Sequence, residues 1–315
     1  MFNFVQNRKW YYLFSLTVIT LGIIAMIYST VTFGAPLRLS IDFTGGSLFV
    51  LQFNGQATEN GIRDVFSRFG EGNAIIQRVG RAEDNTWQVR AGFMEAEKVN
   101  EIKTALSESV ASLDNARSTF DNINPSIGSE VTRSALIAVV ATAVVILLFI
   151  WFAFRRVPHS VRYATCAIIA VIHNVLVTAG LMSLAGALLG WEADVLFLTA
   201  MLTVIGFSVQ DTIVVYDRIR ENIPKRRGEP FEIIVNRSLL EVLQRSLTTQ
   251  LNAIFVMVSI LLFGGATIKQ FIAVMLVGLM SGTYASLCNA VPLVVSWELG
   301  EFGALLGLRR KPHAV

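Results

Sequence analysis

A single carboxylate stands inside an apolar part of the chain. The stretch from Phe197 to Asn222 reads FLTAMLTVIGFSVQDTIVVYDRIREN; it begins as an apolar run of the kind found in membranes and ends in a burst of charge. Asp211 lies in the apolar part, with no cation next to it in the sequence. Insertion scales assign an Asp at the centre of a membrane helix a cost of about 2.5–3.5 kcal/mol. A carboxylate at that depth therefore needs a partner or a proton, and the chemistry that it offers is reversible proton binding.

A candidate partner lies in a later apolar segment that also carries polar residues. In SLLEVLQRSLTTQLNAIFVMVSILLFGG, four of them recur at i, i+4, i+7 and i+11, which places them on one helical face: Glu241, Arg245, Thr248 and Asn252. Arg245 is predicted to lie at a depth close to that of Asp211, and we interpret it as the counter-charge. The alternative is that Arg245 extends to the membrane interface and is solvated there. Gln210 beside Asp211, and Asn174 in another apolar run, complete the predicted supporting polar network.

Two catalytic interpretations are disfavoured by the spacing of these residues. An intramembrane aspartyl protease needs two aspartates on facing helices, whereas Asp211 and Asp217 share one predicted helix, about 9 Å apart along it. A Ser/His hydrolase needs a nucleophile in a Gly-rich setting, which Ser208 lacks. We therefore predict no catalytic residue. What remains is a proton-titrating transport or energy-coupling protein, with a purely structural hydrogen-bonding role for Asp211 as the alternative.

The composition predicts a protein with several membrane spans. Of 315 residues 53% are hydrophobic and only 16% are charged, against about 25% charged in a soluble globule. The formal net charge of +3 creates no strong basic field, so no nucleic-acid partner is expected. The histidines and cysteines show no metal-ligand spacing, and we predict neither a metal nor a cofactor for them: His159, His173, His313, Cys166 and Cys288.

Six segments reach or approach the roughly 20 apolar residues that a helix needs to cross a bilayer. They are Trp10–Phe33, Ser134–Phe154, Tyr163–Leu189, Val195–Tyr216, Leu247–Gly264 and Phe271–Trp297. The first is too long for the hydrophobic region of a signal peptide and lacks a cleavage site at its end, so we interpret it as an uncleaved anchor.

Basic residues are concentrated at one predicted side of the membrane, which favours a cytoplasmic location for that side. The first basic pair is Arg8 and Lys9, and the chain ends with Arg309, Arg310 and Lys311. Both termini are therefore predicted to be cytoplasmic. The predicted organisation is an N-terminus with the first span (1–33), an extracytoplasmic α/β domain (34–133), a five-helix membrane bundle (134–300) and a basic cytoplasmic tail (301–315).

The segment between the first two spans alternates between strand and helix patterns. LSIDFTGGSLFVLQF indicates a strand interrupted by Gly45 and Gly46, and TENGIRDVFSRF indicates a helix with Thr58 as its N-cap. AIIQRVG and TWQVRAGF indicate two strands joined by a turn at Arg81–Asn85, followed by an amphipathic helix and a last strand, RSTFDNI. The order β-α-β-β-α-β predicts a ferredoxin-like domain.

Several of these motifs together resemble the SecF proteins, membrane subunits of the bacterial Sec protein-export machinery. The motifs are IDFTGG, GFSVQDTIVVYDRIREN, NRSLLEVLQRSLTT and LLFGG, in this order along the chain. The resemblance implies a partner subunit, SecD, which completes a twelve-helix bundle related to the resistance-nodulation-division efflux proteins. It also implies use of the proton gradient for late steps of preprotein export in the bacterial inner membrane, with the SecYEG translocon, YajC and YidC as further partners. The alternative function is half of a proton-coupled efflux transporter.

The resemblance also assigns roles to individual residues. Asp211 matches the transmembrane aspartate of the family and Arg245 its transmembrane arginine, both implicated in proton passage. Two positions depart from the family pattern, because Gln210 stands where Asn is usual and Asn174 where a carboxylate is common. The remaining matches are signature residues: Asp42, Gly45, Gly46, Asp217, Arg218, Arg220 and Glu221.

Overall fold

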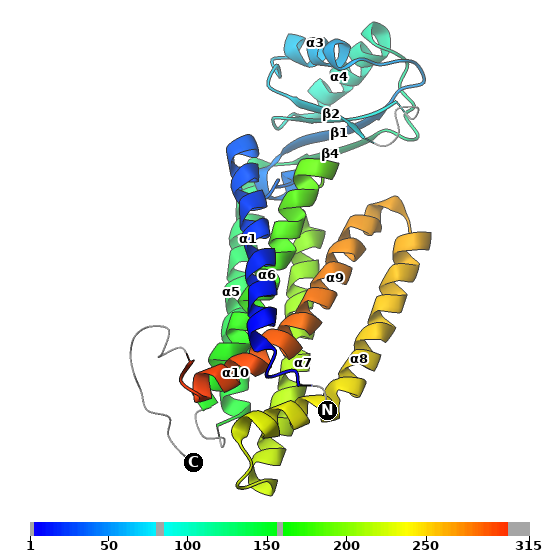
Figure 1. The fold of residues 1–315 in the computed structure, drawn as a ribbon. Helices are drawn as coiled ribbons and strands as arrows, with labels where there is room; N and C mark the ends of the chain where they lie inside the picture. Colours follow the sequence, from blue (N-terminus) through cyan, green and yellow to red (C-terminus); the bar gives the residue numbers. More distant parts are fainter. Residues whose placement is uncertain (1–2, 80–84, 156–159, 302–315) are drawn as a thin grey trace. The chain divides into compact units, whose positions relative to one another are not determined.

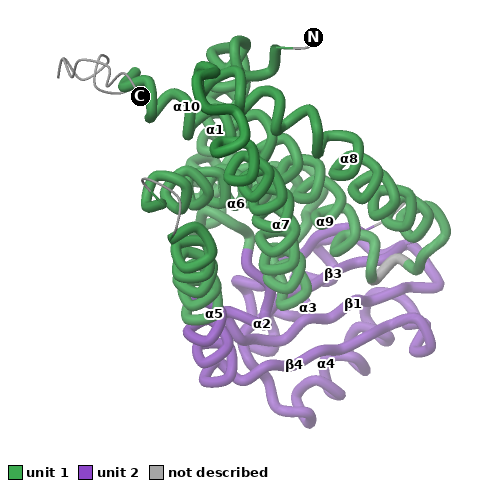
Figure 2. The backbone as a smooth tube through the Cα atoms, turned by 90° about the horizontal axis from the view of Figure 1, so that it is seen from below, with its two compact units in different colours: residues 1–38, 137–315 green, residues 39–136 purple. Residues whose placement is uncertain are grey.

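The computed structural model describes residues 3–79, 85–155 and 160–301. Within these ranges the chain forms two compact units, one of residues 1–38 with 137–315 and one of residues 39–136 (Figures 1 and 2). The predicted turn at Arg81–Asn85, apart from Asn85, lies outside the described residues. So do His159, His313 and, apart from Glu301, the basic tail.

Six helical segments of the described chain are long and apolar enough to cross a membrane, which confirms the predicted number. Most extend beyond the predicted bounds, because polar helical turns continue the apolar runs. They are α1 (Arg8–Phe33), α5 (Pro125–Ala153), α6 (Ser160–Leu189), α7 (Val195–Lys225), α8 (Phe231–Phe263) and a composite last segment. That last segment consists of α9 (Ala266–Tyr284), the π-helix η2 (Ala285–Ala290) and α10 (Val291–Glu298).

Helix α7 shows how the sequence extends a span into the charged region. The Asp194 side chain caps its first turn by accepting a hydrogen bond from the Phe197 amide at 2.7 Å. At the other end the helix continues past the predicted Tyr216, where Asp217 and Arg220, three residues apart, form an ion pair. Such i, i+3 pairs stabilise a helical surface. The helix thus carries the apolar run and the charged signature on one continuous element.

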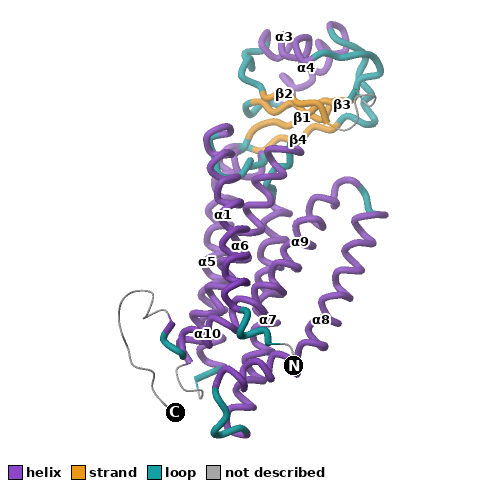
Figure 3. The backbone as a smooth tube through the Cα atoms, in the orientation of Figure 1, coloured by secondary structure: helices purple, strands orange, loops and turns teal. Residues whose placement is uncertain are grey.

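Glycines permit the close helix crossings in the membrane unit, residues 1–38 and 137–315. Figure 3 shows this unit as a bundle of helices. A Cβ atom at Gly180 of α6 would lie 2.5 Å from the Gly22 Cα of α1. A Cβ atom at Gly278 of α9 would lie 2.5 Å from the Val204 side chain of α7. Gly282, one turn further along α9, faces Ser208 of α7. Gly278 and Gly282 therefore permit a close approach of α9 to α7.

The second unit is a four-stranded antiparallel sheet with strand order β2-β3-β1-β4. Helices α3 and α4 cover one of its faces (Figure 3). The Thr58 hydroxyl caps α3, as predicted, by accepting from the Gly61 amide. Along the chain the elements follow the predicted β-α-β-β-α-β order: β1 (Gly46–Gln52), α3 (Glu59–Arg68), β2 (Ile75–Val79), β3 (Thr86–Ala91), α4 (Ala96–Ser109) and β4 (Thr119–Ile123).

The core of this unit is apolar, and one buried polar group ties it together. Phe49, Phe66 and Leu106 are among its fully buried side chains. The buried Ser47 hydroxyl accepts from the Met94 amide at 3.1 Å and donates to the Asn122 side chain at 2.9 Å. The fold class predicted from the sequence, a six-helix membrane protein with a ferredoxin-like α/β domain, is confirmed. The side of the membrane on which the domain lies stays a prediction.

One local prediction is wrong. The segment before Gly45 and Gly46 is a short helix, α2 (Ile41–Thr44), where the alternating pattern indicated a strand. The Ser40 side chain caps this helix by accepting from the Asp42 amide. The two glycines then adopt φ of +70° and +120°, a region that side chains with a Cβ disfavour. Local capping and left-handed glycines therefore override the strand pattern.

Candidate functional site

Six buried polar residues from four elements form what we call the polar layer. Asp211 lies on α7, with Ser208 about one helical turn before it and Thr212 directly after it, and each of the three is at most 5% exposed. The neighbouring elements contribute Asn174 from α6, Gln250 from α8 and Ser286 from η2, all buried.

The carboxylate of Asp211 has an amide as its partner. The Gln250 Nε2 donates a hydrogen bond to Asp211 Oδ2 at 2.6 Å. Arg245, the predicted counter-charge, is exposed, and within the described part of the chain it forms no ion pair with Asp211. The two residues that the sequence singled out are therefore not in contact in this structure, and a role for them as a pair stays a prediction.

Gln250 was missed by the sequence analysis, although a signal exists. The predicted polar stripe of α8 follows Arg245, Thr248 and Asn252, all of which are exposed. A second periodic set on the same helix, Val242, Ser246 and Gln250, is buried. Val242, Ser246 and Gln250 stand at i, i+4 and i+8, so they share one side of α8. That side faces the core.

The π-helix η2 connects the last span to the polar layer. The Ser286 hydroxyl donates to the Ser208 carbonyl oxygen at 2.7 Å. It also lies 3.0 Å from the Thr212 hydroxyl, which is in hydrogen-bonding range. Single π-helical turns inside α-helices occur frequently at functional sites. The π-helical turn places the Ser286 hydroxyl against the turn of α7 that precedes Asp211.

Asn174 lies against the same turn from the side of α6. Its side chain is fully buried, and a Cβ atom at Gly282 would come within 2.9 Å of Asn174 Nδ2 and 3.1 Å of Ser208 Cβ. Among the described residues neither polar atom of the Asn174 amide, nor the Ser208 hydroxyl, nor Gln250 Oε1 has a hydrogen-bond partner. Buried polar atoms of this kind are the usual sites of internal water. The layer therefore offers groups through which a proton can reach a carboxylate.

The other members of the predicted network lie apart from Asp211. Gln210 is exposed and lines a shallow hollow with Ile146 and Phe149 of α5. The hydroxyl of Thr248 donates to the Gln244 carbonyl oxygen of its own helix. Of the four supporting residues that were predicted, the structure places only Asn174 in the polar layer.

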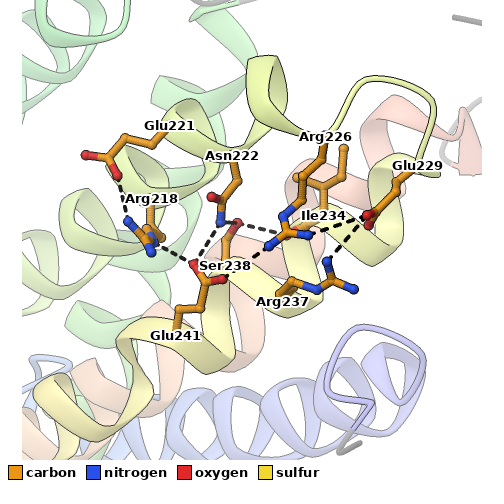
Figure 4. Close-up of polar contacts among 9 residues, drawn as sticks. All are labelled: Arg218, Glu221, Asn222, Arg226, Glu229, Ile234, Arg237, Ser238 and Glu241. Atoms are coloured by element: carbon orange, nitrogen blue, oxygen red, sulfur yellow. Dashed lines mark hydrogen bonds and ion pairs between the residues drawn. The ribbon is translucent and has the colours of Figure 1, made fainter.

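The charged signature forms a network between the ends of α7 and α8 (Figure 4). Arg218 binds Glu221 at 2.7 Å and Glu241 at 2.6 Å, so it joins the two helices. The Asn222 amide donates to the same Glu241 carboxylate and to the Ser238 hydroxyl, each at 2.9 Å. The predicted residues Arg218 and Glu221 are thus brought together here. Further along, Arg226 and Arg237 both contact Glu229 (Figure 4).

A second ionic cluster connects the start of α1, the first helix, with the end of α10, the last helix. Arg8, at the start of α1, forms ion pairs with Glu232 of α8 and with Glu301 beyond α10. The Arg8 hydrogen bond holds the pKa of the Glu301 carboxyl below its usual value. Arg162 of α6 pairs with Glu298 at the end of α10. The last helix is therefore fixed to two other helices by charge.

The remaining signature residues belong to the other compact unit. Gly45 packs against the first turn of α5, where a Cβ atom would lie 2.5 Å from the Pro125 Cα. The Thr132 hydroxyl of α5 donates to the Phe43 carbonyl oxygen. Gly45 and the Phe43 carbonyl thus connect the start of the domain to the helix that follows it, whereas Gly46 lies against the Ala91 carbonyl oxygen of β3.

The fold and the polar layer define a polytopic membrane protein with a titratable carboxylate in its helical core, a class that includes gradient-coupled transport machines. The family model for the C-terminal part of SecD and SecF protein-export membrane proteins matches residues 102–300, and the SecD/SecF GG-motif model matches residues 30–57. The chain belongs to the SecD/SecF family.

Relatives match over nearly the whole chain. The protein translocase subunit SecF of Thermobaculum terrenum is 41% identical over 310 residues, covering 96% of each chain. SecF of Anaerolinea thermophila is 41% identical over 307 residues, with the same coverage. SecDF of Bacillus subtilis is 30% identical, and the match covers 94% of this chain and 38% of that one.

A solved structure shares the fold. The crystal structure of SecDF from Thermus thermophilus, described as a translocon-associated membrane protein, matches with a TM-score of 0.77 at 29% identity. The match covers 94% of this chain and 38% of the SecDF chain. In SecDF proteins, the region similar to this chain is thus continuous with a longer second part.

Proposed function

We propose that this chain is an accessory membrane subunit of Sec protein export that, with a SecD-type partner, couples the proton gradient to late steps of preprotein translocation. Family membership and the names of its relatives support the export role. The observation that carries the coupling role is the buried Asp211 carboxylate, whose bonding partner among the described residues is an uncharged amide. A carboxylate in such a position can gain and lose a proton during a cycle.

The partner subunit covers the face of α7 and α8 that exposes polar side chains. Gln210 of α7 and Arg245, Thr248 and Asn252 of α8 are exposed on helices apolar enough to span a membrane. Polar groups of this kind rarely face lipid and usually meet other protein or water. The fused SecDF relatives, of which this chain matches 38%, contain a second part long enough to supply that protein.

Arg245 acts when the helices rearrange against the partner. An arginine that approaches Asp211 favours the charged carboxylate, and its withdrawal favours proton uptake. Alternation between the two arrangements loads a proton on one side and releases it on the other. The termini face the cytoplasm and the α/β unit lies outside it, as the distribution of basic residues favours. Contacts with SecYEG, YajC and YidC are proposed on the resemblance to the family alone.

The first experiment changes Asp211. Asp211→Asn keeps the size of the side chain and part of its hydrogen bonding but cannot titrate. We expect it to abolish the stimulation of export by an imposed proton gradient in membrane vesicles that contain the partner subunit. Assembly with the partner, measured by co-purification, should be unchanged. Thr203→Val on the same helix is the control, because the Thr203 hydroxyl bonds only to the backbone oxygen of Thr199 among the described groups.

The double variant Asp211→Asn/Arg245→Met separates coupling from a structural role. If the two residues are only a static ion pair in the assembled complex, removing both charges leaves none uncompensated, and gradient-stimulated export returns. If Asp211 carries the proton, the double variant stays as inactive as Asp211→Asn. Recovery of stimulated export would therefore reject the proposed coupling role.

A further inference from the structure

Gln250 is the one residue whose side chain hydrogen-bonds to the Asp211 carboxylate within the described residues. Its Nε2 donates to Asp211 Oδ2 at 2.6 Å across the interface between α8 and α7, and both side chains are 5% exposed. The hydroxyls of Thr212 and Ser286 are engaged elsewhere, since they bond to each other and to the Ser208 backbone, and the Ser208 hydroxyl has no partner among the described residues. The position of the carboxylate therefore depends on the amide.

An amide is suited to a carboxyl group that changes its protonation state. A charged carboxylate only accepts hydrogen bonds, and the amide nitrogen of Gln250 donates one to it. A protonated carboxyl also donates, and the acceptor that it then needs is available as Gln250 Oε1, which has no partner among the described residues. An arginine has donors only and can bind the charged form alone.

We propose that Gln250 is the positioning residue for Asp211 and bonds to its carboxyl group in both protonation states, through Nε2 when the group is charged and also through Oε1 when it is protonated. This inference rests on the proposed function, in which Asp211 carries a proton. Proton uptake then changes the charge of the site while the carboxyl group keeps its place in the helix interface. Arg245 competes for the charged form only, so the two residues of α8 have distinct roles.

Infrared difference spectroscopy on the purified complex with the partner subunit tests this assignment. The C=O stretching band of protonated Asp211 is identified by its absence in Asp211→Asn. In Gln250→Met, which is similar in size and lacks the amide, we expect the band to move to higher frequency, because the carbonyl has lost a hydrogen bond. A group that only fills space would leave the band in place.

Export in vesicles gives the second measurement. Loss of a hydrogen bond to a charged group changes an equilibrium constant by a factor of about ten to a hundred. Gradient-stimulated export should therefore fall in Gln250→Met by about that factor. Thr249→Val is the matched control on the adjacent residue, whose exposed hydroxyl bonds to the Arg245 carbonyl oxygen, and it should change neither the band nor export.

A shorter amide keeps the test decisive if Gln250→Met does not assemble. Gln250→Asn retains the donor and the acceptor but reaches less far by one methylene group, so the band should move in the same direction by a smaller amount, with partial loss of stimulated export. An unchanged band, or full stimulated export, in an assembled variant would overturn the role of Gln250. Stimulated export that persists in Asp211→Asn would instead reject the proposed function, whatever the Gln250 variants do.

Discussion

Two charged sites of this chain lie in contrasting environments. Arg218 and Glu241 lie at helix ends, partly exposed and bound to opposite charges. Asp211 lies in the helical core and is bound to a neutral amide. Exposed pairs contribute little to stability because water screens them, about 0–1 kcal/mol each. A buried carboxylate is costly to keep charged, which is the property that makes it responsive to a proton.

Glu301 provides a pH-dependent contribution to stability. Its pKa is lowered below the ordinary 4.5, first by the hydrogen bond from Arg8. A carboxyl group with a lowered pKa in the folded state stabilises the fold above its unfolded pKa and loses this effect as the pH falls through the folded pKa. We expect Glu301→Gln to lower the free energy of unfolding at pH 7 by about 0.5–1 kcal/mol, a value that allows for partial exposure.

Thermal unfolding in detergent measures this difference at two pH values. The gap in Tm between the natural chain and Glu301→Gln should be present at neutral pH and should disappear well below pH 4.5, the ordinary value of the group. At low pH the natural carboxyl is protonated and as neutral as the amide. A gap of the same size at both pH values would show that the charge of Glu301 is not what stabilises this contact.

The sequence predicted the residues of this site unevenly. Asp211 could be found because a charge inside an apolar run violates the pattern of the run itself. Its partner Gln250 was missed, because an uncharged amide among Thr and Asn residues has no such contrast and only its spacing from Ser246 and Val242 marks it. The choice of Arg245 followed charge complementarity, whereas contact depends on which face of α8 is turned toward α7. That face is set by packing between distant segments.

At the level of elements, the crossing of α1 and α6 depends on a pair of glycines. In Gly180→Ala the added methyl group would lie 2.5 Å from the Gly22 Cα, so the helices must separate. We expect destabilisation by about 1–3 kcal/mol, the range for overpacking. Thermal unfolding of the purified chain in detergent should show a lower Tm.

Gly206→Ala is the matched control for this prediction. A Cβ atom at Gly206 meets no other atom within 4 Å. Ala favours a helix over Gly by up to about 1 kcal/mol, so this variant should unfold at the same or a higher temperature. Equal losses in the two variants would mean that the close approach at Gly22 is not what lowers the Tm of Gly180→Ala.

Elements were predicted well where one periodicity dominates and poorly where local bonds compete with it. The six spans and the alternating strands follow from long apolar or alternating runs. The helix at Ile41–Thr44 depends on the Ser40 cap and on backbone angles at Gly45 that no periodicity encodes. The π-helix inside the predicted span Phe271–Trp297 has no sequence signal in hydropathy, because its side chains remain apolar or small.

For the whole molecule, the proposed orientation gives a labelling test. With Cys166 and Cys288 first replaced, a single cysteine at Glu101, exposed on α4, should react with an impermeant maleimide added to intact cells. A single cysteine at Arg227, exposed between α7 and α8, should react only after the membrane is opened. Labelling of the second site in intact cells would reverse the orientation, since the segment between the fourth and fifth predicted spans has the largest group of basic residues on the predicted cytoplasmic side: Arg218, Arg220, Lys225, Arg226, Arg227 and Arg237.

The π-helix in the last span changes the phase of that span. An α-helix turns by about 100° per residue, and a π turn holds one residue more than an α turn. The faces of α10 are therefore offset from those that α9 would project if it ran on unbroken. A change of Ala285–Ala290 from a π-helix to an α-helix without a change of length would rotate α10 by about that angle and carry Glu298 away from Arg162. Deleting one residue in this segment would instead remove the π turn and keep the phase of α10. Members of the family whose last span is one residue shorter should accordingly lack the π turn and keep the charge that ends the helix in its place.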